Sequence, residues 1–407
     1  MTEQLQAEPV ADGVVRTVSP GRRQAFLPVP TVQCHAANLA MLPSGDLACV
    51  WFGGTQEGTH DICVYFSRLA DGVDRWSTPA LLSADPGRSE QNPVLFTAPG
   101  GRVWLLYTAQ LAGNQDTAEV RGRVSDDDGR TWSATRTVIP ADERGGVFVR
   151  QQPVFLDDGR WVLPVFRCVR VEGEKWAGDR DVSSIWVSED AGASWSESDV
   201  PGSLGAVHMN VLRMADGTYR ALYRSRWADH VYLSSSDDGV AWSAPVPTVL
   251  PNNNSSIQAV VRRSGALVLA YNHASAADAR GRRESLYDEI GDNGTVVDRS
   301  DQPSAPDRRQ RPPDGAPDAR TAFWGAPRAP LALAVSTDAG ATWSPRHVIE
   351  DGDGYCLTND SRHGLNRELS YPSILEGPDG ALHVAYTRHR SAIAYVRLSP
   401  DWPRQPA

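Results

Sequence analysis

The sequence predicts an all-β fold, a six-bladed β-propeller whose blades each contain four antiparallel strands. Two interleaved repeats carry this prediction: a turn motif of eight residues, and a hairpin pattern that recurs six times. We expect residues 1–407 to form one domain, because closed all-β rings often run long as a single unit. A strand near residues 14–18 is expected to complete the last blade, which would join the two ends of the ring and remove free sheet edges.

The turn motif has the pattern Ser-x-Asp-x-Gly-x-x-Trp. Its serine and aspartate can bond backbone amides in a tight turn, and its glycine can adopt a backbone conformation that a Cβ disfavours. Its tryptophan can pack back onto the blade. A degenerate copy runs from Ser67 to Trp76, and the four full copies are Ser125–Trp132, Ser188–Trp195, Ser235–Trp242 and Ser336–Trp343. Four such copies in register indicate one repeated structural unit.

The hairpin pattern consists of two runs rich in β-branched and aromatic residues around a turn that contains glycine or aspartate. Its six copies span residues 38–52, 92–107, 152–166, 210–223, 257–271 and 370–386. Each copy supplies the two inner strands of one blade.

One long segment interrupts this rhythm. Residues 274–330 fall inside the fifth blade, and their middle, about 298–320, is rich in proline, aspartate and arginine. A stretch this polar cannot build a core, so we expect a mobile loop there. The flanks 282–291 and 323–331 contain aromatic and aliphatic residues, and we expect them to be ordered and to cover the pocket as a lid.

Composition narrows the classes of partner. A formal net charge of −10 argues against a nucleic-acid surface, which is usually basic. The five cysteines show no CxxC pairing, so free thiols are expected rather than a zinc site or a disulfide framework. The first 15 residues lack a signal-peptide pattern, and no apolar run is long enough to span a bilayer. We therefore expect a cytoplasmic protein with no nucleic-acid or membrane partner; the oligomeric state is left open.

The eight-residue turns resemble the Asp-boxes, or bacterial neuraminidase repeats, of the sialidase superfamily, and the resemblance extends from about Val32 to Leu398. It implies a sialidase-like propeller whose Asp-boxes lie on the outer rim and have no catalytic role. Sialidases also carry three arginines that clamp the substrate carboxylate, a Tyr/Glu nucleophile pair and an acidic proton donor. The first of those arginines is absent here, because the matching place reads Cys34-His35-Ala36-Ala37-Asn38.

The resemblance places Tyr371 where the nucleophilic tyrosine would lie, with Glu368 three residues before it. Glu57 and Asp61 lie on the loop where sialidases carry the proton donor; the alternative is a solvated turn. His35 could act as a general acid or base, since its ordinary pKa is near neutrality, or it could be a core histidine bonded to a neighbouring carbonyl.

Topology predicts which other residues line the pocket. In a propeller the innermost strands surround the axis, and the loops that lead into them open on one face. Polar residues at these places are candidates for binding: Asn38, Asn92, Arg150, Gln152, His208, Asn210, Asn254 and Arg367. Arginines that follow a hairpin could hold an anion or face water: Arg224, Arg226, Arg388 and Arg390. Three further candidates border the insertion: His273, Arg283 and Tyr287.

These residues predict a carbohydrate substrate. The first hypothesis is an exo-acting glycoside hydrolase on the terminal residue of an acidic or deoxy-sugar-containing glycan, in which Tyr371 and Glu368 form the nucleophile pair and Glu57 or Asp61 donates the proton. The second is a lyase that eliminates across a uronate, for example rhamnosyl-glucuronate, with arginines neutralising the carboxylate and His35 as the base. The third is a glycan-binding propeller without catalysis. No cofactor is expected, and a structural cation in the central channel has no readable ligand motif.

Overall fold

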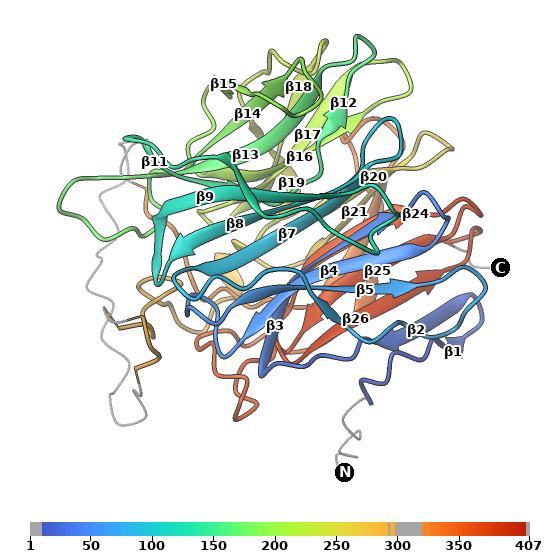
Figure 1. Ribbon diagram of the computed structural model, residues 1–407, viewed down its shortest axis with the longest axis horizontal. Coiled ribbons are helices and arrows are strands. Elements are labelled where there is room, and N and C mark those ends of the chain that lie inside the picture. The colour runs from blue at the N-terminus through green and yellow to red at the C-terminus, as the bar shows by residue number, and fades with distance from the viewer. Residues whose placement is uncertain (1–9, 292–293, 298–319, 404–407) are drawn as a thin grey trace.

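The protein is a six-bladed β-propeller, as the repeats predict. The computed structural model describes residues 10–291, 294–297 and 320–403, and in them six antiparallel sheets form a ring (Figure 1). The single helical element of the described residues is a short 3-10 turn, η1 (Ala276–Asp278). Each blade begins with a buried inner strand at the axis and ends with a short outer strand.

The first three blades follow the chain in order. Their strands are β3 (Gln33–Met41), β4 (Leu47–Gly54), β5 (Cys63–Leu69) and β6 (Ala80–Leu81) in the first, β7 (Ser89–Thr97), β8 (Val103–Leu111), β9 (Asn114–Ser125) and β10 (Arg136–Ile139) in the second, and β11 (Gly145–Val149), β12 (Val154–Phe155), β13 (Trp161–Val169), β14 (Val182–Ser188) and β15 (Ser196–Asp199) in the third. In the third blade the inner position is split between β11 and β12, which both pair with β13.

The last three blades complete the ring. Their strands are β16 (Ala206–Arg213), β17 (Tyr219–Ser225), β18 (His230–Ser236) and β19 (Val246–Pro251) in the fourth, β20 (Gln258–Val261), β21 (Leu267–Asn272), β22 (Leu331–Ser336) and β23 (His347–Glu350) in the fifth, and β24 (Leu369–Glu376), β25 (Leu382–Arg388), β26 (Ala392–Leu398), β2 (Arg22–Phe26) and β1 (Arg16–Ser19) in the sixth. All six predicted hairpins are present.

An N-terminal strand closes the ring as expected, but the strand that does so is β2 and not the predicted strand at residues 14–18. β2 pairs with β26 from Arg22 opposite Leu398 to Phe26 opposite Ala394. The predicted strand at residues 14–18 overlaps β1, which pairs only with β2 and is exposed along its length. β2 takes the inner place because it is the strand that buries side chains against the blade, Ala25 among them. The sixth blade therefore has five strands.

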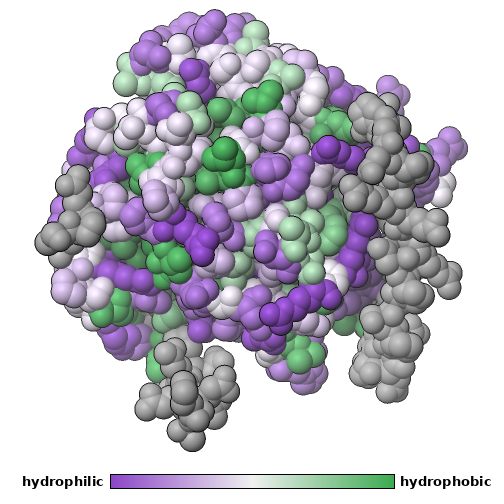
Figure 2. All heavy atoms as spheres, turned by 180° about the vertical axis from the view of Figure 1, so that it is seen from behind, coloured by the Kyte–Doolittle hydropathy of each residue, from purple (hydrophilic) through white to green (hydrophobic). Residues whose placement is uncertain are grey.

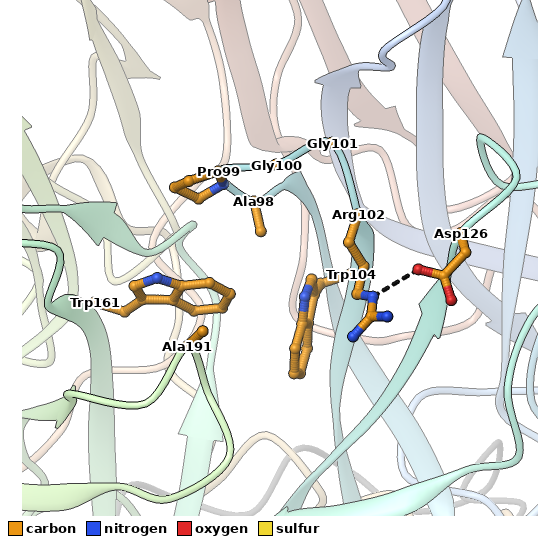
Figure 3. A pocket seen from close by; sticks show the side chains of 9 residues that line it. All are labelled: Ala98, Pro99, Gly100, Gly101, Arg102, Trp104, Asp126, Trp161 and Ala191. Atoms are coloured by element: carbon orange, nitrogen blue, oxygen red, sulfur yellow. Dashed lines mark hydrogen bonds and ion pairs between the residues drawn. The ribbon is translucent and has the colours of Figure 1, made fainter.

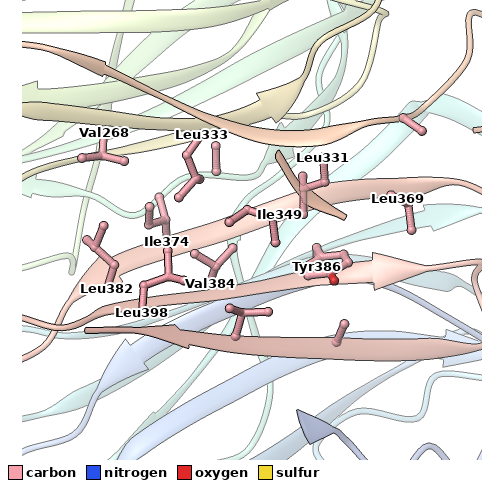
Figure 4. Packing of buried hydrophobic residues seen from close by; sticks show 14 residues of the cluster. Val268, Leu331, Leu333, Ile349, Leu369, Ile374, Leu382, Val384, Tyr386 and Leu398 are labelled. Carbon is pink, nitrogen blue, oxygen red and sulfur yellow. The ribbon is translucent and has the colours of Figure 1, made fainter. Parts of the chain in front are cut away.

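Apolar side chains fill the spaces between adjacent blades. Between the fifth and sixth blades, Leu331 and Leu333 from β22 pack with Ile374, Val384 and the other buried side chains of the same cluster (Figure 4). Truncating a leucine in such a core to alanine costs about 2–5 kcal/mol. The face shown in Figure 2 carries apolar residues scattered among polar ones, which is ordinary for a protein surface.

The eight-residue turns make the predicted local bonds. In the first full copy the Ser125 hydroxyl accepts a hydrogen bond from the Gly129 amide at 2.8 Å, and Asp127 accepts one from the Thr131 amide at 2.8 Å. The third copy departs from the expected register. Its bonding pair is Ser236 and Asp238 rather than the residues one position earlier, because the turn is one residue shorter there.

Residues 274–330 lie between β21 and β22, within the fifth blade. Most of the stretch expected to be a mobile loop, 298–319, lies outside the described residues. The flank 282–291 packs Leu286, Tyr287 and Ile290 into an apolar cluster with Trp324 of the other flank and side chains of the second, third and fourth blades. Both flanks therefore lie over the axial end of these blades.

Candidate active site

A β-bulge interrupts the inner strand of four blades at the same point. The strand register shifts between His35 and Asn38, Gln91 and Val94, Val207 and Asn210, and Ser370 and Ser373. A bulge inserts an extra residue and turns its side chain away from the regular alternation. One residue of each bulge has a positive φ: Ala36 (59°), Asn92 (48°), His208 (56°) and Tyr371 (52°). Asn254, just before β20 in the fifth blade, shares this conformation with φ 56°.

Tyr371 lies at the centre of the resulting cluster. A tyrosine with positive φ is uncommon and stores backbone strain, which tends to concentrate at functional sites. Its hydroxyl accepts a hydrogen bond from Nη1 of Arg224 at 2.7 Å. The His35 ring centre lies 4.1 Å from that of Tyr371, and the His208 ring centre lies 5.8 Å away. Three of the sequence candidates thus surround the tyrosine.

Arg224, at the end of β17, is held by neighbours but keeps one nitrogen free of them. Its Nε donates to Oδ1 of Asn254 at 2.8 Å, and its Nη1 lies 3.4 Å from Nε2 of His208. Its Nη2 is buried and makes no hydrogen bond to any described residue. An unpartnered buried guanidinium nitrogen is costly, so this position favours an anionic acceptor.

Glu368 is fixed between two arginines. Its carboxylate lies 3.0 Å from Nη1 of Arg328 and 3.2 Å from Nε of Arg390, and it accepts a hydrogen bond from the Ser370 hydroxyl at 2.7 Å. Burial alone would raise the pKa of this carboxyl, but the two guanidinium groups outweigh burial and hold the pKa well below its usual range. None of its hydrogen bonds among the described residues goes to Tyr371. Glu368 is thus an ionised anchor for its neighbours.

The other acidic candidates differ in their surroundings. Glu57 is buried at the axis, where its Oε2 accepts a hydrogen bond from Nη1 of Arg390 at 2.6 Å. Asp61 lies on the exposed turn and accepts hydrogen bonds from Thr55 and Thr59. Glu57 therefore reaches the pocket, whereas Asp61 stabilises its own turn.

The cluster carries an excess of positive charge. Four buried arginines, Arg150, Arg224, Arg328 and Arg390, surround two buried carboxylates, so four positive charges face two negative ones. Arg150 lies beneath the tyrosine ring with its guanidinium carbon 5.2 Å from the ring centre, and it donates to the carbonyls of Ala37 and Tyr371. Two uncompensated cations in a buried site suit a ligand that carries a carboxylate.

Both pocket histidines are neutral. Burial lowers the pKa of His35 well below its ordinary value, and the nearby Arg390 lowers it further. Burial and the nearby Arg224 do the same to His208. Nδ1 of His35 lies 3.4 Å from Oε1 of Glu368. Nε2 of His35 and Nδ1 of His208 make no hydrogen bond to a described residue. A neutral imidazole with a free nitrogen can accept a proton.

Several candidates at the axis tie blades together instead of facing the pocket. The Asn38 side chain accepts a hydrogen bond from the Leu95 amide at 2.9 Å, and the Asn210 side chain accepts one from the Ala259 amide at 2.6 Å. Gln152 donates to the carbonyl of Leu95 at 2.6 Å. These three side chains therefore link adjacent blades instead of facing the pocket.

The insertion places three polar side chains next to the axial cluster: Arg283, Tyr287 and Arg328. Nη1 of Arg283 donates to Oδ1 of Asn359 at 3.1 Å, and the Tyr287 hydroxyl accepts a hydrogen bond from Gln115 at 2.9 Å. The flank also supplies Arg328, which the sequence reasoning missed although its segment was expected to be ordered. The signal that could have identified Arg328 is that it is the one charged residue in the otherwise apolar flank 323–331.

Three candidates lie away from the cluster. Arg367 is 41% exposed and pairs with Asp353, and Arg388 pairs with Glu350 on the outer side of its blade. His273 is half-buried and bonds the hydroxyl of Tyr271 at 2.6 Å. Arg390, two residues beyond Arg388, reaches the axis because its turn has a positive φ of 53°.

The insertion packs closely against Glu368. A cavity of about 10 Å³ remains between Glu368 and Arg328 on one side and Leu286 and Trp324 on the other, which is room for roughly one water molecule. A wider groove of about 340 Å³ lies at the hairpin-turn end of the second and third blades (Figure 3). Trp104 and Trp161 line that groove with only 5% and 4% of their surface exposed, so they offer little face for a ligand. The axial cluster is the better candidate site.

In the part of the chain that the structure describes, no group of three or more histidine, cysteine, aspartate or glutamate side chains could hold a metal ion. No helix among the same residues is both long and apolar enough to span a bilayer. All five cysteines are free thiols.

Comparison with known proteins agrees with the fold. Residues 45–384 match the family model described as a BNR repeat-like domain. No curated protein matches the sequence. The chain is similar to a protein of unknown function from Dyadobacter fermentans, at 15% identity and a TM-score of 0.63, covering 96% of this chain and 98% of that one.

Two solved sialidases are also similar in structure. The intramolecular trans-sialidase from Ruminococcus gnavus, solved with oseltamivir carboxylate, is 12% identical with a TM-score of 0.62, covering 99% of this chain and 100% of that one. The Hadza microbial sialidase Hz136 is 14% identical with a TM-score of 0.62; the match covers 91% of this chain and 66% of that one. Likeness at this level of identity establishes a shared sialidase-like fold.

Proposed function

The chain belongs to the family of proteins with a BNR repeat-like domain, and we propose that its axial pocket binds a terminal sugar carrying a carboxylate and cleaves the adjoining glycosidic bond. The observation that carries this proposal is the excess of arginine around Tyr371, together with the unpartnered Nη2 of Arg224. A guanidinium group matches a carboxylate in geometry and charge. The sialidase-like fold supports a sugar as the bearer of that carboxylate.

Hydrolysis would use Tyr371 as the nucleophile on the anomeric carbon. The Arg224 guanidinium, whose Nη1 lies 2.7 Å from the tyrosine hydroxyl, would orient that oxygen. The proton donor is the weak point of this route. Both acidic side chains at the axis are already bound to arginines: Glu57 pairs with Arg390, and Glu368 pairs with Arg328 and Arg390.

Elimination across a uronate needs a cation beside the carboxylate and a neutral base instead of an acidic side chain, and we propose it as the reaction. An arginine would neutralise the carboxylate and so acidify the adjacent C–H bond, from which a neutral His35 or His208 would take the proton. The electrons of that bond would form a carbon–carbon double bond as the bond to the leaving oxygen breaks. The Tyr371 hydroxyl would protonate the departing oxygen, and its hydrogen bond from Arg224 supports this role.

The identity of the products tests the proposal. The full chain would be incubated with glycans in which a terminal sugar, such as a deoxy sugar, is linked to the 4-oxygen of a uronate, and with glycans that end in a sialic acid, and the products would be weighed by mass spectrometry. Elimination gives products whose masses sum to that of the substrate, one of them absorbing ultraviolet light through its conjugated double bond. Hydrolysis adds one water molecule to that sum. Binding without either product would support a glycan-binding propeller and overturn the enzyme proposal.

A further inference from the structure

Asp181 and Arg226 form a buried ion pair next to the axial cluster. Nε and Nη2 of Arg226 donate to Oδ2 of Asp181 at 2.9 and 2.6 Å, and the Trp176 indole nitrogen donates to Oδ1 at 3.0 Å. Both charged side chains are at most 2% exposed. Because Arg226 is bonded in this way through two of its nitrogens, it is committed to Asp181 rather than to a ligand.

Three aromatic rings enclose the Arg226 guanidinium. Its central carbon lies 5.3 Å from the ring centre of Phe166, 5.6 Å from that of Trp176 and 5.1 Å from that of Trp324. These distances are in the range of cation–π attraction, which is strong when the cation is desolvated. Phe166 and Trp176 belong to the third blade, whereas Trp324 belongs to the insertion. The ion pair thus holds the insertion against the body of the propeller.

The backbone next to Trp324 continues this connection to Arg224. The Phe323 amide donates to the Arg226 carbonyl at 2.8 Å, and the Phe323 carbonyl accepts a hydrogen bond from the Asn254 side chain at 2.9 Å. The other end of the same Asn254 amide accepts from Nε of Arg224 at 2.8 Å. The Trp324 ring centre also lies 5.7 Å from the Arg224 guanidinium carbon. Two routes therefore lead from Arg226 through the insertion to Arg224.

We propose that the Asp181–Arg226 pair is a positioning element, which fixes Trp324 and Phe323 of the insertion so that these in turn hold Arg224 on the hydroxyl of Tyr371. The pair itself does not contact the reacting groups. Its effect on turnover rests on the proposed function, whereas its effect on the insertion does not.

The test substitutes Arg226→Lys, which keeps the charge but loses the two-pronged bond and the flat face that stacks on aromatic rings. Arg167→Lys is the matched control. Arg167 is also 1% exposed, is paired with Glu197 at 2.5 Å, and has its guanidinium carbon 5.8 Å from the Trp186 ring, but its partner Glu197 lies on β15, the outermost strand of the third blade. Two quantities would be measured on each full-length variant: hydrogen exchange of the amides in 321–326, and kcat and KM on a cleaved glycan.

We expect Arg226→Lys to speed exchange at the Phe323 amide by roughly tenfold or more, since the segment that carries it would open locally. We expect kcat to fall by about 10- to 100-fold with KM changed less than about threefold, as for the loss of a group that orients a reacting side chain. Arg167→Lys should change neither quantity. Trp324→Ala should reproduce the effect, and the double variant should lose little more than either single one.

Exchange at Phe323 that is no faster in Arg226→Lys than in Arg167→Lys would overturn the proposal. So would equal kcat values in the two variants. If the unaltered protein cleaves no glycan, the proposed function fails, and the exchange measurement still decides whether the ion pair positions the insertion.

Discussion

Replacing Tyr371 with phenylalanine removes the hydroxyl at the centre of the site and nothing else. The ring keeps its place between His35 and Arg150, whose centres lie 4.1 and 5.2 Å away. What is lost is the acceptor for Nη1 of Arg224 at 2.7 Å. Because Nη2 of that arginine already has no described partner, a second buried nitrogen of the same guanidinium loses its acceptor.

The size of each effect follows from that contact. A hydrogen bond to a charged group contributes about 1.5–3 kcal/mol, so the free energy of unfolding should fall by about that amount. Removing the group that moves a proton typically costs about 100- to 10,000-fold in rate, equivalent to about 3–5 kcal/mol in the barrier. We therefore expect a folded protein with a large loss of kcat.

Tyr223→Phe is the matched control. Tyr223 precedes Arg224 on β17, is fully buried, and its hydroxyl bonds that of Ser234 at 2.7 Å. Denaturant unfolding and initial rates of glycan cleavage would be measured for both variants. The control should lose about 1 kcal/mol of stability and keep its rate within about threefold. A rate for Tyr371→Phe as high as that of the control would refute the placement of Tyr371 in the reaction.

Three further predictions concern other contacts. Glu368→Gln leaves Arg328 and Arg390 without their shared anion. Because one partner of a buried ion pair is lost, the free energy of unfolding in denaturant should fall by about 3–5 kcal/mol. A fall of less than about 1 kcal/mol would contradict this. Replacing both His35 and His208 with asparagine should abolish an elimination product, as seen by ultraviolet absorbance, while a hydrolysis product would persist; an unchanged ultraviolet signal would contradict a histidine base. Burial lowers the pKa of His383 to about 4, whereas the ordinary pKa of a histidine in the unfolded chain is about 6.5. Between these two pH values the unfolded chain binds a proton that the folded protein does not. The free energy of unfolding should therefore fall by up to about 1.4 kcal/mol for each pH unit as the pH is lowered from roughly 6.5 to 4. Urea unfolding of His383→Gln should show a flatter pH dependence, and an equal slope would rule this histidine out as the cause.

The sequence determined the architecture because its signals are local. Each hairpin and each eight-residue turn is specified by neighbours in the chain, as the bonds from Ser125 and Asp127 show, and counting them yields six blades. The same locality located His35, Arg224 and Tyr371 near the axis. The strand that closes the ring was misplaced, because residues 14–18 and β2 both read as short strands and only packing against β26 distinguishes them.

Contacts between distant segments decided the chemistry. Asn38 and His35 are three residues apart on one inner strand, yet Asn38 bonds the next blade and the ring of His35 lies against that of Tyr371. Arg328 reaches Glu368 across 40 positions of the chain, and Arg390 reaches Glu57 across 333. These long-range distances decide which arginine is paired with a carboxylate of the protein and which remains available to bind a ligand. These distances cannot be read from the spacing of the residues in the chain, because they arise only when distant segments pack together in the tertiary structure.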